Sequence, residues 1–233
     1  MTTAARRAAS SAQSSADIAK DLAGAIVERR LPPGTKLKEE ALARLYAVSR
    51  TKVRAALLML SKDELIEIVP EKGACVSRVS RREAQEIFAV RRALEAMLAR
   101  EFVARASADD YRRIDRHLAQ ERAALVSGNT RLRAKLLADF HILLAEIAGN
   151  QVLLGIVGRL AARTSLIAMR NQSDRDANCS SDEHAQFIAA ARAGDADGAA
   201  LMMMQHLAHV QDALGFDEDA DDRDRDLITA LLI

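Results

Sequence analysis

The chain has 233 residues, of which 49% are hydrophobic and 29% charged, and its formal net charge is +1. This length allows one large domain or two ordinary domains with apolar cores, which excludes a disordered chain. Aromatic residues make up only 3% and Pro and Gly are sparse, so the composition predicts a mostly α fold.

Charge is unevenly distributed along the chain. Residues 1–79 hold 14 Lys and Arg against 9 Asp and Glu, a net charge of +5, whereas residues 80–233 carry a net charge of −4. A polyanionic partner is therefore expected to bind the N-terminal portion.

The chain begins with residues 1–15, which lack apolar periodicity and are expected to form a disordered arm. The start has no apolar core of a secretory signal, and no run in the chain approaches the ~20 apolar residues of a membrane span. Only two cysteines are present, Cys75 and Cys179, which fits a reducing compartment. We expect a cytoplasmic protein without a membrane partner.

Residues 16–79 contain the next predicted elements. Apolar residues at helical spacing predict a helix from residue 16 to about residue 30, which the stretch "LPPGTKL" ends. Two helices at 39–46 and 49–62 follow, and then two β-rich runs form a hairpin across the turn "PEKG". This order is that of a winged helix-turn-helix, whose second helix inserts its N-terminal residues into the DNA major groove.

The helix at 49–62 carries cations where an isolated helix disfavours them, because the positive end of its macrodipole lies there. Arg50 and Arg54 are four residues apart and can bind guanine edges, whereas Lys52 lies off that face and suits a phosphate. Ser49, the expected N-cap, and Thr51 can bond a phosphate or a base edge. The alternative is an ordinary solvated face on a core helix, which leaves the turn and the hairpin unexplained.

The stretch "LPPGTKLKEEALARLYAVSRTKVRAALLMLSKDELIEIVPEKGACVS" resembles the DNA-binding domain of the GntR family of bacterial transcription regulators. The family core runs close to V-S-R-T-P-V-R-E-A-L and is followed by a P-x-x-G wing. The resemblance implies DNA contacts from the start of the third helix and from the wing, at Ser49, Arg50, Thr51, Lys52, Arg54, Lys72 and Gly73. Lys52, Ala55 and Glu64 replace the common Pro, Glu and Gly, and none of these changes removes an arginine that the family uses on DNA.

Residues 80–215 are predicted to form an all-α helical bundle, which can enclose a cavity between facing helices. The expected helices lie at about 80–104, 107–126, 129–148, 150–171, 182–193 and 195–215. The segments "AVRRALEAMLA", "DFHILLAEIAGN", "SSDEHAQFIAAARAGDADGAA" and "MMMQHLAHV" resemble the FCD ligand-binding domain, the effector domain of the FadR branch of the GntR family. The resemblance implies that this bundle binds an effector and forms the dimer.

The FCD resemblance implies a divalent-metal site at His141, His184 and His206. Many members add an acidic ligand one helical turn before the first histidine, but here that residue is Leu137, and Asp139 lies about 200° round the helix from His141. Imidazole suits Zn, Ni, Cu or Fe, with water or an effector carboxylate completing the coordination. The alternatives are three hydrogen-bonded core histidines, or a metal-free cavity in which they bind an anionic effector directly.

Other polar residues near this expected site have weaker support. The resemblance places Arg91 and Arg92 on a helix that flanks the cavity, where only one of the two faces inward to clamp an effector carboxylate; a pair of surface cations is the alternative. His117 and His209 lack the family context and are expected at the surface or between helices. Cys179 replaces the missing ligand only if its loop folds inward.

These expectations lead to a dimeric, ligand-responsive transcription regulator, most simply a repressor, which binds double-stranded operator DNA and a small carboxylate effector. One rival is a helical metalloenzyme whose three histidines activate water, although Asp182 and Glu183 are expected in the first turn of a helix and no general base is obvious. Another is a structural DNA-binding protein without an effector response. Residues 216–233, with seven carboxylates at 217–226, are expected to form a solvated tail.

Overall fold

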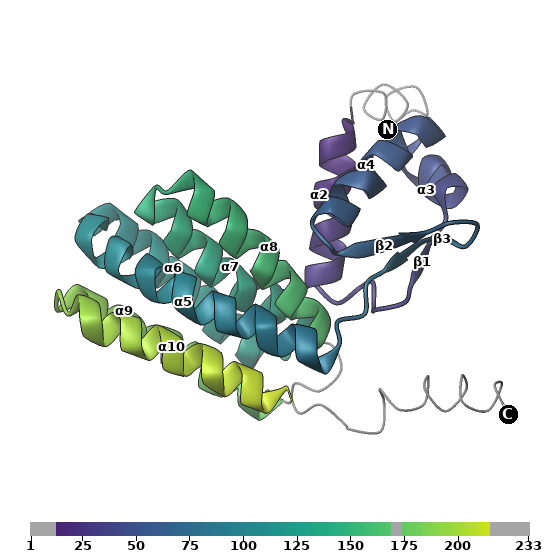
Figure 1. Ribbon diagram of the computed structural model, residues 1–233. Helices are drawn as coiled ribbons and strands as arrows, with labels where there is room; N and C mark the ends of the chain where they lie inside the picture. The colour runs from purple at the N-terminus through teal and green to yellow at the C-terminus, as the bar shows by residue number, and fades with distance from the viewer. Residues whose placement is uncertain (1–12, 169–173, 215–233) are drawn as a thin grey trace, which may run out of the picture.

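The computed structural model describes residues 13–168 and 174–214 (Figure 1). The expected tail at 216–233 lies outside this part of the chain, as does the expected arm up to residue 12. The described residues form a small helical unit with a sheet, followed by a larger bundle of helices (Figure 1). The expected fold class, a winged helix-turn-helix followed by an all-α bundle, is confirmed.

The N-terminal unit combines three helices with a three-stranded antiparallel sheet of strand order β1-β3-β2. Its elements in chain order are α2 (Ser15–Val27), β1 (Lys36–Leu37), α3 (Glu39–Tyr46), α4 (Arg50–Lys62), β2 (Ile66–Val69) and β3 (Gly73–Val76). Their apolar faces share one core, which includes Ile18, Ile26, Val53, Leu57 and Ile66.

Local hydrogen bonds explain where these helices begin and end. Ser14 and Asp17 form a capping box at the start of α2, which satisfies backbone N–H groups that would otherwise have no partner. The Ser49 side chain accepts a bond from the backbone N–H of Lys52 at the start of α4, as its expected N-cap role requires. Ala47 adopts a left-handed conformation that ends α3, so only a tight turn separates α3 from α4.

The sequence did not predict strand β1. Its two residues pair with β3, Lys36 opposite Cys75 and Leu37 opposite Ala74. A strand of two residues after "LPPGT" is too short to show a period-two pattern, so only its pairing with β3 defines it. The buried side chain of Leu37 anchors it to the core.

The C-terminal unit consists of six long helices. They are α5 (Arg81–Arg105), α6 (Ala108–Val126), α7 (Thr130–Ala148), α8 (Gln151–Ala168), α9 (Asp174–Arg192) and α10 (Ala196–Ala213). Its core is built around Phe88, Phe102, Phe140 and Phe187. The expected break before residue 182 is wrong for residues 174–181, which are helical and begin α9. Among the helices of the described ranges, none is both long and apolar enough to cross a bilayer.

Helix α8 joins the two units. Its Leu166 is 1% exposed and belongs to the core of the N-terminal unit, although the helix itself is part of the bundle. Arg163, on the same helix, forms ion pairs with Glu64 at the end of the α4–β2 turn and with Glu83 in α5. In Figure 1, α8 is the bundle helix that extends toward the lower end of α2.

We predict that Leu166→Ala destabilises the protein by about 2 to 5 kcal/mol, because it removes a fully buried side chain between two units that cannot close the cavity completely. Urea unfolding followed by circular dichroism measures this change. Val126→Ala is the control, since Val126 is 89% exposed at the end of α6, and its effect should stay within about 0.5 kcal/mol. Equal effects of the two substitutions would contradict the prediction.

Candidate functional site

The first turns of α4 present the expected DNA-binding residues. Arg54 donates two hydrogen bonds to Glu39 of α3, from Nε at 2.9 Å and from Nη2 at 2.8 Å. Arg50 makes a longer contact of 3.5 Å to the same carboxylate. Both arginines remain exposed, and their hydrogen bonds lower the pKa of Glu39, that from Arg54 most, although its slight burial opposes the shift. Glu39 thus orients two guanidinium groups at the N-terminus of α4.

The other expected DNA contacts lie on the same unit. Thr51 is exposed and Lys52 half-buried on α4, and Lys72 and Gly73 are exposed where the hairpin turns from β2 to β3. Gly73 has a φ of +86°, a left-handed conformation that favours glycine. The hairpin therefore carries Lys72 on a tight exposed turn, the geometry of a wing.

The second candidate site lies inside the bundle, where His141 of α7, His184 of α9 and His206 of α10 come together. All three are buried, and each offers a nitrogen that lies within 4.8 Å of the nitrogens of the other two. They are 43 and 22 positions apart in sequence, so only the packing of three helices brings them together. The expected cluster is therefore present.

Each histidine ring is held by a carboxylate through Nδ1. The distances are 2.5 Å from His141 to Glu95, 3.1 Å from His184 to Glu121 and 2.8 Å from His206 to Glu183. An ionised carboxylate only accepts hydrogen bonds, so each Nδ1 carries the proton and donates it. In a neutral ring with its proton on Nδ1, Nε2 keeps the lone pair that a metal ion needs. The Nε2 atoms of His184 and His206 lie 3.3 Å apart.

Burial favours the uncharged rings of His141 and His206. Burial lowers the pKa of His206 to about 3, against the opposing hydrogen bond to Glu183. Burial also lowers the pKa of His141, more than the neighbouring Glu95 charge raises it. Burial opposes ionisation of Glu95, yet the Arg91 charge and His141 together outweigh it and hold the pKa of this carboxyl well below its usual range. The cluster thus combines ionised carboxylates with uncharged rings at His141 and His206, the protonation states that metal binding needs.

The arrangement fits a divalent metal ion. Two nitrogens bound to one tetrahedral ion at about 2.0–2.1 Å lie about 3.3 Å apart, which matches the separation of the His184 and His206 Nε2 atoms. In metal sites, the ring nitrogen of a ligating histidine that does not bind the metal usually donates a hydrogen bond to a carboxylate or a carbonyl, as Nδ1 does here. The Phe140 ring stacks on the His184 ring, with 3.8 Å between the two ring centroids, and further fixes the orientation of His184.

The fourth position has no protein ligand among the described side chains. Leu137, one turn before His141, lines the cavity beside the histidines and offers no donor atom. Asp139 is paired with Lys135 on its own helix rather than turned to the histidines. The side chain of Cys179, the other expected substitute, lies outside the described residues.

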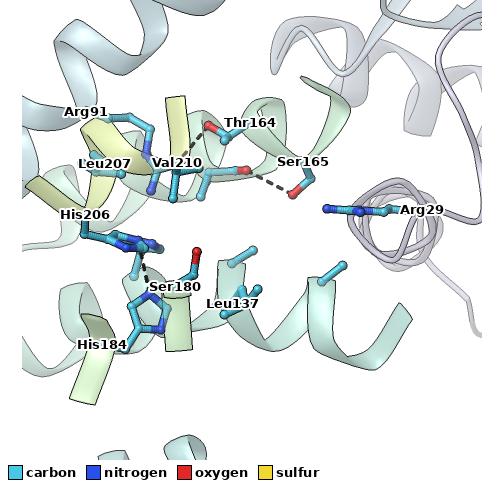
Figure 2. A pocket seen from close by; sticks show the side chains of 14 residues that line it. Arg29, Arg91, Leu137, Thr164, Ser165, Ser180, His184, His206, Leu207 and Val210 are labelled. Carbon is cyan, nitrogen blue, oxygen red and sulfur yellow. Dashed lines mark hydrogen bonds between the residues drawn. The ribbon is translucent and has the colours of Figure 1, made fainter. Parts of the chain in front are cut away.

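A cavity of about 60 Å³ adjoins the three histidines (Figure 2). Arg91 of α5 lies at this cavity and is 3% exposed. Its Nε donates to Glu95 at 2.6 Å and its Nη1 to Thr164 at 3.0 Å. Its Nη2 is buried without a hydrogen-bond partner among the described residues. Arg92 is half-buried, donates to Gln211 and does not line the cavity, so Arg91 is the inward-facing member of the pair.

Several residues of this site were missed from the sequence. Glu95 and Glu121 had no assigned role, and Glu183 was placed in a first helical turn, which is wrong because α9 begins at Asp174. His117, expected at the surface or between helices, is buried between helices, with its Nε2 2.9 Å from the Leu136 carbonyl oxygen. His209 is exposed and contacts Glu183.

A winged helix-turn-helix joined to a helical bundle with a buried polar cavity is the architecture expected of a ligand-responsive DNA-binding protein. Comparison with protein families gives the same result: residues 14–76 match the bacterial regulatory proteins of the gntR family, and residues 86–209 match the FCD domain. The FCD match covers more than half of the chain, so the chain belongs to the GntR family, in the branch that carries an FCD domain. It is therefore a DNA-binding transcriptional regulator with an effector domain.

Characterised relatives are similar over most of their length. The transcriptional repressor GlaR of Escherichia coli K12 is 30% identical over 192 residues, which cover 78% of this chain and 87% of GlaR. The transcriptional repressor RspR of the same strain is 26% identical over 190 residues, 81% of this chain and 83% of RspR.

Two solved structures share the fold. E. coli McbR/YncC has a TM-score of 0.79 at 20% identity, and a GntR regulator from Rhodococcus sp. RHA1 has a TM-score of 0.77 at 19% identity. Each comparison covers 86% of this chain and 96% of the solved chain.

We predict that the metal-free protein loses stability as the pH falls from about 6.5 to 5. His206 has a pKa of about 3 when folded and about 6.5 when unfolded. The unfolded chain thus binds a proton in this range that the folded chain does not, and stability falls with pH by roughly 1 to 2 kcal/mol. Chelator-treated wild type and His206→Gln are compared by urea unfolding at several pH values. The substitution should flatten the dependence, and parallel curves would contradict this assignment.

Proposed function

We propose that the protein is a homodimeric repressor in the cytoplasm that binds operator DNA under the control of a small carboxylate metabolite, bound beside a divalent metal ion. The observation that carries this proposal is the buried Nη2 of Arg91, which has no described hydrogen-bond partner at a cavity bordered by three histidines that could hold a metal ion. A buried guanidinium nitrogen without an acceptor is costly, and an effector carboxylate supplies the acceptor.

The size of the cavity supports a small effector. A volume of about 60 Å³ is well below the 300–1,000 Å³ of drug-sized ligand sites. It admits a carboxylate and little more, so larger parts of an effector require the cavity to open. His141, His184 and His206 would hold zinc or nickel, and a bound ion would supply a Lewis-acidic position for an oxygen of the effector.

The DNA part of the proposal concerns α4 and the wing. Arg50 and Arg54 would bind base edges, because Glu39 holds both guanidinium groups at the exposed start of the helix. The sugar-phosphate backbone of the DNA at the same half of the operator would be contacted by the remaining residues of this surface, Ser49, Thr51, Lys52, Lys72 and Gly73. One such unit makes few contacts, whereas two units related by a two-fold axis bind a palindrome with much higher affinity. Exposed apolar side chains on the neighbouring helices α5 and α10, Val90, Met97 and Leu201, offer a surface for the second copy.

An enzymatic role for the histidine cluster has less support. Metal-dependent hydrolysis needs a general base that reaches the substrate, and none of the described residues lining the cavity is a carboxylate. Glu95, Glu121 and Glu183 hold the outer nitrogens of the histidines instead. These roles suit a binding site better than a catalytic one.

We predict that Arg50→Ala and Arg54→Ala each weaken binding to the preferred operator by about 1 to 3 kcal/mol and relax sequence choice, because each removes a group that binds a base edge. Lys52→Ala is the matched control, since loss of a phosphate contact weakens binding to all sequences alike. Selection of bound fragments from random DNA identifies the operator, and fluorescence anisotropy then measures the affinities. Unchanged operator affinity in both arginine variants would refute the assignment.

We predict that the wild-type protein binds one zinc ion per chain. His184→Ala should lower zinc affinity by about 10- to 100-fold or more, whereas Leu137→Asp should raise it, because an added carboxylate stands one turn before His141. Calorimetric titration of zinc into chelator-treated protein measures both changes, with Asp139→Asn as the control, because Asp139 pairs with Lys135 rather than with the histidines. A wild type that binds no zinc, or a Leu137→Asp variant with weakened binding, would argue against the metal site.

A further inference from the structure

Arg29 reaches the effector cavity from the DNA-binding unit. It follows α2 in the chain, yet its side chain lines the cavity together with Leu137 of α7 and Ser165 of α8 (Figure 2). Its Nε is buried. Among the described residues that line this cavity, all the others belong to helices of the bundle. The wall of the cavity is thus completed by the other unit.

The backbone at Arg29 supports a role for its side chain. Arg29 has a φ of +60°, a left-handed conformation that costs a residue other than glycine free energy. The turn is fixed by bonds from the N–H groups of Arg30 and Leu31 to the carbonyl of Ala25, in the manner of a helix end where glycine is favoured. An arginine at this position is therefore not explained by the turn itself.

Charge at this end of the cavity favours an anion. Burial lowers the pKa of Arg29, and the nearby positive charge of Arg133 lowers it further. Both effects mean that the guanidinium would be stabilised by an adjacent negative group. In Figure 2, Arg29 points into the cavity from the side opposite His206, with Ser165 between Arg29 and Thr164, the residue that bonds Arg91. The cavity thus has two guanidinium groups from two different units.

We propose that Arg29 is a second effector-binding residue, and that the effector is a small dicarboxylate held by Arg91 at one carboxylate and by Arg29 at the other. This inference rests on the proposed effector cavity and adds its ligand class and its means of control. A dicarboxylate bound in this way contacts the bundle and the DNA-binding unit at once. It therefore has a different affinity for different arrangements of the two units, which a ligand needs in order to shift their equilibrium.

The first experiment measures binding of matched acids to the zinc-loaded full-length protein by calorimetry. The probes are malonate and succinate, each compared with the monocarboxylate of the same chain length, propionate and butyrate. Wild type should prefer the dicarboxylate of each pair. Arg29→Gln should lower dicarboxylate affinity by about 10- to 100-fold, the loss of one charged hydrogen-bonded pair, and leave monocarboxylate affinity within about threefold.

Two further variants separate binding from folding. Arg29→Gly removes the side chain but suits the left-handed backbone, so it introduces no backbone strain and should show the same loss of dicarboxylate preference, with circular dichroism checking that the variant is folded. Arg30→Gln is the matched control, because Arg30 is the exposed neighbour of Arg29 in the chain. Among the described side chains, it forms a hydrogen bond only with Glu28. It should bind all four acids as wild type does. A dicarboxylate preference that survives in both Arg29 variants would overturn the inference, as would wild type that binds none of the four acids at millimolar concentration.

The second experiment measures control of DNA binding. The better dicarboxylate should change the operator affinity of wild type by about 5- to 150-fold, and operator DNA should change its affinity by the same factor. Arg29→Gln saturated with the same acid should show less than about a threefold change. One outcome would reject the role of Arg29 alone: the Arg29 variants behave as wild type, while Arg91→Met abolishes the binding of monocarboxylates. The proposed function would then stand. If operator DNA is not bound even without acid, the proposed function fails.

Discussion

The bundle is organised around carboxylates in its interior, each of which needs hydrogen-bond donors. Glu95 and Glu121 are at most 1% exposed, and an ionised carboxylate buried without donors costs several kcal/mol. Histidine rings on neighbouring helices supply these donors: Glu95 of α5 binds His141 of α7, and Glu121 of α6 binds His184 of α9. Each pair fixes how far one helix can slide along another. The same bonds orient the rings of His184 and His206 so that their Nε2 atoms lie 3.3 Å apart, and one set of contacts thus determines both the packing and the proposed metal-ligand positions.

The sequence predicted the local features of the fold well, because these depend on residues close together in the chain. The N-cap at Ser49, the wing turn and the order of the bundle helices depend on spacings of a few residues. The three histidines were found through the family resemblance, and their meeting in one cluster agrees with it. Strand β1 was missed because only its pairing with β3 defines it.

The outer partners of the histidines could not be predicted in the same way. Glu95 lies 46 positions from His141, and Glu121 lies 63 positions from His184. A carboxylate at such a distance in sequence looks like any solvated helix residue until the helices are packed. Local signals did exist, since Arg91 and Glu95 are four apart, as are His117 and Glu121. Glu183 was misplaced for another reason: polar residues at 174–181, typical of a loop, continue a helix in the packed structure.

The sum of charges around the cavity gives one explanation for two features, the absence of a carboxylate at Leu137 and the presence of Arg29. Glu95, Glu121 and Glu183 carry three negative charges and Arg91 one positive charge, so these four groups sum to −2 before any ion is bound, with the histidines left aside. A divalent cation brings this sum to zero. An aspartate at position 137 would leave it negative and would repel an anionic effector, whereas Leu137 leaves it neutral. An effector that brings a carboxylate would then need further positive charge nearby, and in the proposed site Arg29 would supply that charge from the DNA-binding unit. Helix α8 lies between the two units at this point, with Thr164 and Ser165 on the cavity and Leu166 in the core of the DNA-binding unit. A change of charge in the cavity would therefore act on Arg29, a residue of the unit that binds DNA.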